Sequence, residues 1–262
     1  MKYTIYRKII PLAVIVALAV SVLSGCDNTG AAKTEQPAEV KKNPIMIENS
    51  IPEPVETATP EPTETPAPDP ADYFCIEEIS DEVFARMEGK SFAEGCTMPR
   101  EDLRYLRLLY KDIEGNTHEG EMVCNVLIAD KLVAIFRQLY VADYPIERMV
   151  LIDEYNGDDE ASMSDNNTSC FNYRVVSGTT KLSKHAMGLA VDVNPRYNPY
   201  IHKINGTEVV EPANGEAYTD RSRDFEYKID KEDLAYKLFT DAGFTWGGAW
   251  KSTKDYQHFQ YE

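Results

Sequence analysis

Several residue types that mark common binding sites are scarce in this chain. Its 262 residues include four histidines and two tryptophans, and no two of its five cysteines have the C-x-x-C spacing of a zinc knuckle. Positive charge is scarce too, because 27 lysines and arginines stand against 44 aspartates and glutamates, giving a formal net charge of −17. This excess of negative charge argues against nucleic acids and anionic lipid surfaces as partners.

The longest apolar run lies at the N-terminus, over residues 9–23, and three basic residues precede it. It is long enough for a signal peptide and short for a membrane span. The run ends in Leu23-Ser-Gly-Cys26, which resembles the cleavage box of bacterial lipoproteins. The resemblance implies that residues 1–25 are removed and that Cys26 carries lipid. An uncleaved anchor and an ordinary secretory signal are the alternatives.

Aromatic residues are absent from 27–72, where nine of the fifteen prolines lie. A segment rich in proline, threonine and glutamate cannot bury enough apolar area to offset its ordering entropy. We therefore predict that residues 26–72 form a disordered tether.

The remaining residues, 73–262, have the length and aromatic content of one domain. We expect a short helix over 80–88 and two strands over 103–110 and 117–127, with a turn at 114–116. A further strand is predicted over 149–152. Two longer helices are predicted, one capped by Asp130 and one running from a cap at Asp230 to about residue 242, with Gly243 as its stop. Mixed helices and strands without a regular βαβ rhythm indicate an α+β fold.

The cysteines left after lipidation are Cys75, Cys96, Cys124 and Cys170. An oxidising compartment permits three pairings among them, and four free thiols are the alternative.

Two of the four histidines lie in informative surroundings. His185 precedes Gly188-Leu-Ala-Val-Asp192-Val-Asn, in which apolar residues alternate with Ala190, Asp192 and Asn194. This alternation predicts a strand with Asp192 on the face opposite the apolar residues. Gly188 lets the backbone turn so that His185 returns over that face. A carboxylate on such a strand needs a partner, and a metal ion or an arginine would serve.

The second histidine, His258, lies on a predicted final strand near the C-terminus, where it alternates with Phe259 and Tyr261. Two imidazoles and one carboxylate match the three protein ligands of catalytic zinc sites, which leave one position open for water. A nearby carboxylate must then accept the proton of that water. Asp255 would do so from the turn that enters the strand. By spacing alone, structural histidines remain the alternative.

Four linked stretches together resemble a known family. They are Phe171-Asn-Tyr-Arg174, Ser183-Lys-His185 through Asp192-Val-Asn-Pro195, Asn198-Pro-Tyr200, and Phe244-Thr-Trp-Gly-Gly-Ala-Trp250 with Asp255-Tyr-Gln-His258-Phe259. The chain from about residue 75 is similar to the zinc D-alanyl-D-alanine carboxypeptidases and L-alanyl-D-glutamate endopeptidases. That family includes vancomycin-resistance carboxypeptidases and has the hedgehog/D,D-peptidase fold, an antiparallel sheet with helices packed on it.

The resemblance implies roles for six residues. His185, Asp192 and His258 would hold one zinc ion per chain, and Asp255 would be the general base. Arg174 would stabilise the oxyanion, with a structural ion pair to Asp192 or Asp153 as its alternative role. Ser183 would contact the first ligand or the substrate.

The resemblance also implies a substrate, a peptidoglycan stem peptide, and an extracytoplasmic monomer held at the membrane by its lipid alone. Aspartate at 255 and the Trp-Gly-Gly-Ala-Trp stretch favour the endopeptidase branch over the carboxypeptidase branch. A non-catalytic, zinc-containing wall-binding lipoprotein is the alternative function. Trp246 and Trp250 are expected to be packing residues. His118 and His202 match no motif and are expected at the surface.

Overall fold

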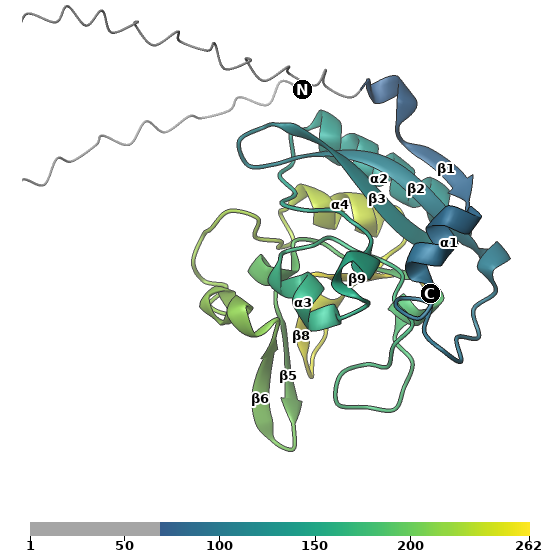
Figure 1. The fold of residues 1–262 in the computed structure, drawn as a ribbon. Helices are drawn as coiled ribbons and strands as arrows, with labels where there is room; N and C mark the ends of the chain where they lie inside the picture. The colour runs from purple at the N-terminus through teal and green to yellow at the C-terminus, as the bar shows by residue number, and fades with distance from the viewer. Residues whose placement is uncertain (1–68) are drawn as a thin grey trace, which may run out of the picture. The chain divides into compact units, whose positions relative to one another are not determined.

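The computed structural model describes residues 69–262 and shows an α+β arrangement (Figure 1). The predicted signal peptide, the lipidated Cys26 and almost all of the predicted tether lie outside the described residues. Within 69–262, no helix has the length and apolar character that a membrane crossing requires.

Nine strands of the described part form three antiparallel sheets of three strands each. The first sheet has the order β1-β2-β3, the second β4-β9-β7 and the third β6-β5-β8. The strand bounds are β1 Cys75–Glu78, β2 Leu103–Lys111, β3 Thr117–Asn125, β4 Ala190–Asp192, β5 Tyr200–Ile204, β6 Thr207–Glu211, β7 Thr245–Trp246, β8 Lys254–Asp255 and β9 His258–Gln260.

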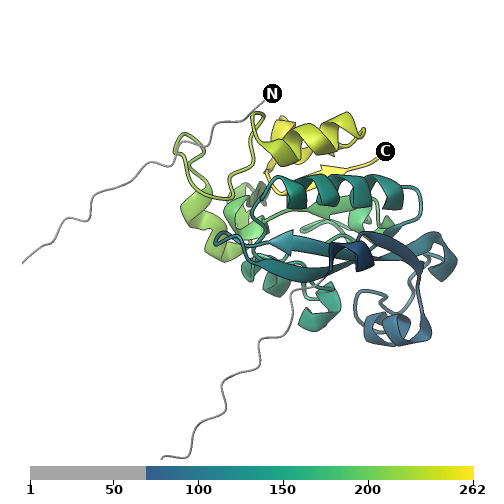
Figure 2. The same cartoon turned by 90° about the horizontal axis from the view of Figure 1, so that it is seen from above.

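Four α-helices accompany these strands: α1 Asp81–Met87, α2 Ala129–Val141, α3 Asp159–Ser164 and α4 Leu234–Asp241. Helix α2 packs on the β1-β2-β3 sheet, and α4 packs on the other side of α2 (Figure 2). Their contact is aromatic, because the Phe136 and Phe239 rings meet edge to face with centroids 6.2 Å apart. Phe239 in turn stacks on Phe259 of β9 at 4.4 Å, so the core runs from the first sheet to the second.

The predicted short helix and the predicted hairpin are confirmed as α1, β2 and β3. Helix α2 is also confirmed, with Leu132, Ile135, Phe136 and Leu139 buried.

The predicted cap of α2 is wrong. Ile128 occupies the N-cap, and Asp130 lies inside the first turn, where its charge is favourable to the helix dipole. The predicted cap of α4 is wrong as well. Asp233 accepts hydrogen bonds from the backbone N–H groups of Ala235 and Tyr236, whereas Asp230 accepts one from Glu232 in the preceding turn.

The predicted strand over 149–152 is also wrong. Met149 and Leu151 are buried in extended backbone, and a 3₁₀ helix begins at Ile152. The Met149 carbonyl accepts one hydrogen bond from the N–H of Glu121 in β3, but no ladder follows. The apolar run therefore packs into the core beside β3 without extending the sheet. All four cysteines of the described residues are free thiols. Of the two alternatives that the sequence left open, disulfide pairing and four free thiols, the structure has the second.

Candidate metal centre

The short β4-β9 ladder places a carboxylate opposite an imidazole. Its register pairs Asp192 with His258 and Val191 with Phe259. Val191 and Phe259 are fully buried in the core, and the alternation of strand residues puts Asp192 and His258 on the opposite face. The predicted strands around these two residues are confirmed, although each is only three residues long.

His185 reaches that face from a single 3₁₀ turn over Lys184–Met187. Ser183 caps this turn by accepting a hydrogen bond from the His185 N–H at 3.3 Å. Gly188 ends it with a φ of 64°. A Cβ at this position would lie 2.7 Å from the backbone nitrogen of Asn125. The predicted role of Gly188 in turning the chain is therefore confirmed.

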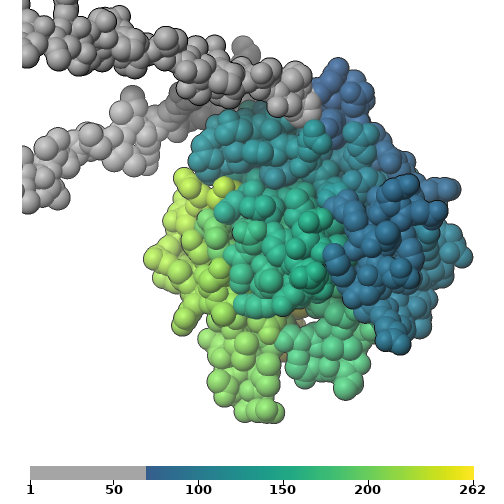
Figure 3. Space-filling model, viewed as in Figure 1, coloured from purple at the N-terminus to yellow at the C-terminus, as the bar shows by residue number. Residues whose placement is uncertain are grey.

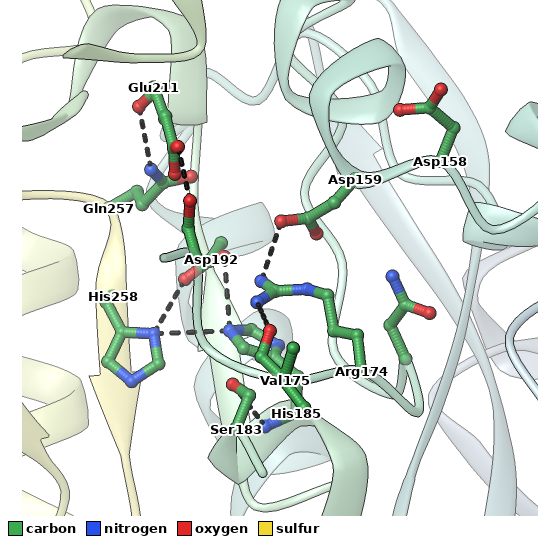
Figure 4. A network of polar contacts seen from close by, with 12 residues as sticks. Asp158, Asp159, Arg174, Val175, Ser183, His185, Asp192, Glu211, Gln257 and His258 are labelled. Atoms are coloured by element: carbon green, nitrogen blue, oxygen red, sulfur yellow. Dashed lines mark hydrogen bonds and ion pairs between the residues drawn. The ribbon is translucent and has the colours of Figure 1, made fainter. Parts of the chain in front are cut away.

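The three predicted ligands converge in the folded chain (Figure 4). Nε2 of His185 lies 3.1 Å from Oδ2 of Asp192, and Nδ1 of His258 lies 3.0 Å from Oδ1. The two imidazole nitrogens are 3.2 Å apart. All three potential ligand atoms lie within 4.8 Å of one another, and all three residues are buried, so this cluster could hold a metal ion.

The remaining ring nitrogens have carbonyl partners that orient both imidazoles. Nδ1 of His185 donates to the Cys170 carbonyl at 2.6 Å, and Nε2 of His258 donates to Oε1 of Gln260 at 3.2 Å. Neutral rings with protons on those nitrogens would leave Nε2 of His185 and Nδ1 of His258 as the two atoms that could bind a metal ion beside Asp192. Outer hydrogen bonds of this kind are typical of histidines that bind metals. The donor set therefore fits zinc.

Charge in the cluster favours an ionised Asp192. Burial by itself would raise the pKa of Asp192, but the charges and hydrogen bonds of His185 and His258 outweigh it and hold the pKa well below its usual range. Burial would lower the pKa of His258, but its hydrogen bond and charge interaction with Asp192 raise it. The cluster thus holds an anionic ligand between two imidazoles.

Asp255 lines the same hollow but comes from a different sheet. The sequence placed it in a turn, whereas it lies in β8 and pairs with Tyr200 of β5. Its Oδ1 is buried and has no hydrogen-bond partner. Burial raises the pKa of Asp255 to about 8, and the nearby charge of His258 opposes that rise.

Gly247 packs directly against Asp255. A Cβ on Gly247 would lie 2.7 Å from the Cβ and from the carbonyl oxygen of Asp255. Real Cβ atoms do not approach other atoms so closely. Glycine at position 247 is therefore what allows the Asp255 backbone and side chain to lie where they do.

Arg174 lines the hollow with its guanidinium paired to Asp159, at 2.8 Å between Nη2 and Oδ2. The alternative partners considered from the sequence, Asp192 and Asp153, are wrong. Asp153 instead accepts from the Ser91 N–H at 3.0 Å, away from the hollow. Nε of Arg174 is buried and has no partner.

The hollow has a volume of about 470 Å³. It opens between the β5-β6 hairpin and the loop over 175–182 (Figure 3). The two walls meet where Ser177 donates a hydrogen bond to Glu211 at 2.6 Å. All six predicted residues of the described chain line this hollow: Arg174, Ser183, His185, Asp192, Asp255 and His258.

Several residues in and around the hollow were missed or misjudged from the sequence. Trp250 lines the hollow, with its ring 5.5 Å from that of His258, whereas Trp246 is a packing residue as expected. Gln257 also lines it and is buried, with its Oε1 unpartnered. His202 is buried against Tyr200, so its expected surface position is wrong. Trp250 lies in a motif stretch and Gln257 adjoins His258, so both had a sequence signal, whereas nothing in the sequence indicated that His202 is buried.

One comparison with known proteins gives a match. A family model described as D-alanyl-D-alanine carboxypeptidase matches residues 177–261. The stretch includes Ser183, His185, Asp192, Asp255 and His258 but begins after Arg174. No curated protein and no solved structure matches the chain. Over less than half of its length, the chain is therefore similar to a peptidase family.

Proposed function

We propose that this chain is a zinc-dependent peptidase that hydrolyses an amide bond in peptidoglycan stem peptides. The observation that carries the proposal is one hollow containing a three-residue metal cluster, a buried unpartnered carboxylate and a guanidinium. The family model over 177–261 supports the peptidase class and a cell-wall peptide as substrate.

His185, Asp192 and His258 would hold the zinc ion. Bound zinc supplies a Lewis acid that polarises the substrate carbonyl and lowers the pKa of water. Asp255 accepts the proton of the attacking water and passes it to the departing amine, because its free Oδ1 faces no competing donor. Arg174 donates to the oxygen of the substrate carbonyl as negative charge develops there. Ser183 holds the turn that carries His185.

The bond that is cut is either the terminal D-alanyl-D-alanine bond or the L-alanyl-D-glutamate bond. The description of the matching family favours the first. The contact between Ser177 and Glu211, which joins the two walls of the hollow, also favours a substrate that ends there. Aspartate at 255 favours the second. We take the terminal bond as the first to test.

Mass spectrometry of stem peptides incubated with the zinc-loaded chain tests this function. Loss of the terminal D-alanine identifies a carboxypeptidase, and a cut after L-alanine identifies an endopeptidase. The control variant is Asp233→Asn. Asp233 caps α4 and does not line the hollow, and asparagine keeps a capping side chain there. A zinc-loaded chain that cuts neither bond supports the wall-binding alternative instead.

We also propose that the chain is anchored outside the cytoplasm through lipid on Cys26. The support is the Leu23-Ser-Gly-Cys26 sequence after an apolar run. Two or more acyl chains would hold the protein stably at a membrane. Fractionation of cells that produce the wild type and Cys26→Ser should find the wild type in the membrane fraction and the variant outside it. Equal membrane retention of both would contradict the lipid anchor.

A further inference from the structure

A carboxylate outside every sequence motif contacts the predicted oxyanion-binding arginine. Asp159 is the first residue of α3, and its Oδ2 lies 2.8 Å from Nη2 of Arg174. The cap of this helix is the preceding residue, Asp158, whose Oδ1 accepts from the Ala161 N–H at 3.0 Å. In Figure 4, Asp159 points towards Arg174 while Asp158 points away. Asp159 is therefore free of the capping role.

The hollow contains other carboxylates that compete for the same guanidinium. Asp192 is engaged by two imidazoles, and Glu211 accepts a hydrogen bond from Ser177. Asp255 has a buried oxygen without any donor, and it lines the same hollow as Arg174. Of the carboxylates in the hollow, Asp255 is thus the one left without a partner for a guanidinium that nothing restrains, and such a pair would engage both the proposed base and the proposed oxyanion donor.

The pair with Asp159 leaves Arg174 with unused donors. Nη1 makes only a long contact of 3.5 Å with the Val175 carbonyl, and Nε makes no hydrogen bond. The Arg174 and Asp159 side chains are about a quarter exposed, so the pair stands at the wall of the hollow and not in the core. Arg174 is thus held through Nη2, while Nη1, whose one contact is long, stays available to a substrate oxygen.

We infer that Asp159 is a positioning residue, which holds the Arg174 guanidinium for the substrate oxygen and keeps it away from Asp255. This inference rests on the proposed function. Asp159 acts through Arg174 and does not itself touch the substrate.

The test is a double-mutant cycle on the zinc-loaded full chain, with the stem peptide that the wild type cleaves. Asp159→Ala should lower kcat/KM about 10–100-fold, the range found for groups that orient the ligands of a metal site. Zinc content should stay at the wild-type level. In an Arg174→Ala background, Asp159→Ala should cost less than about 3-fold more, because the group that it positions is gone. Asp159→Glu should recover part of the activity.

The matched control is Asp158→Asn, which removes a neighbouring charge from the same turn but keeps a capping side chain. It should retain wild-type kcat/KM. Three results overturn the inference while leaving the proposed function intact: Asp159→Ala with wild-type kinetics, an equal loss in both backgrounds, or an equal loss in the Asp158→Asn control. A zinc-loaded wild type that cleaves no stem peptide overturns the proposed function itself, and the role of Asp159 with it.

Discussion

Replacing Asp255 with asparagine should abolish hydrolysis and at the same time stabilise the metal-free chain. The carboxyl group is buried, its Oδ1 has no partner, and its pKa is raised from 3.8 to about 8. Between these two values the folded chain holds a proton that the unfolded chain has released. Titration of Asp255 should therefore lower the free energy of unfolding of the metal-free wild type as pH rises from about 4 to about 8, by about 1.4 kcal/mol per pH unit.

Asparagine keeps the shape of the side chain and removes the titration. At pH 7 the metal-free Asp255→Asn chain should therefore be more stable than the wild type, by up to about 4 kcal/mol. Bound zinc places positive charge near the carboxylate and lowers its pKa, so the gain should shrink in the zinc-loaded chain. Loss of the general base should lower kcat about 10²–10⁴-fold.

The assay is urea denaturation of the chelated chain at pH 5, 7 and 8, paired with kinetics of the zinc-loaded chain. Asp233→Asn serves as the control, because burial raises the pKa of Asp233 to about 6 at the α4 cap. Asp233→Asn should make the free energy of unfolding less dependent on pH only below pH 6, and it should leave kcat unchanged. An Asp255→Asn chain with wild-type activity, or with the wild-type loss of stability from pH 5 to 8, would refute the reasoning.

Three further outcomes follow from the geometry. Gly247→Ala should displace Asp255 and lower kcat at least 10-fold, with zinc content unchanged; wild-type kcat would contradict the close contact. Gly188→Ala should cost more than about 1 kcal/mol of unfolding free energy, because φ is positive and the new Cβ meets the backbone at 2.7 Å; an unchanged Tm would contradict this. Burial raises the thiol pKa values of Cys124 and Cys170, so both should be alkylated only after unfolding. Intact-mass analysis should find every thiol from Cys75 onward reduced. A disulfide among them would contradict the structure.

The convergence of the three candidate ligands was predictable in part, because each lies in a short segment whose neighbours indicate which way it faces. Val191 and Phe259 alternate with Asp192 and His258, and that alternation predicts which side chains share a face. Gly188 marks the turn that returns His185 to them. Local chemistry suggested these three residues and Asp255, but the family resemblance was needed to choose them over structural histidines, and it alone supplied the role of Arg174.

Contacts that depend on tertiary packing were not predictable. Asp159 lies fifteen residues before Arg174, and nothing local distinguishes it from Asp158, so only the folded chain shows which one faces the hollow. The strand expected at 149–152 failed for a related reason. A short apolar run reads the same whether it joins a ladder or packs beneath one.

Caps were misplaced where two acidic residues compete within one turn. Asp230 and Asp233 are both good cap residues, and Asp230 uses its carboxylate in a local turn that leaves the helix start to Asp233. Such choices change an element boundary by a few residues and leave the site untouched.

The most direct test of the central claim is the zinc content of the purified chain after zinc loading and removal of excess metal, measured beside His185→Ala. The account predicts about one zinc per chain in the wild type, a large loss in His185→Ala, and a Tm that rises with added zinc only in the wild type. A folded wild type that retains no zinc, or a His185→Ala chain that retains as much as the wild type, would contradict the claim that His185, Asp192 and His258 form the metal centre.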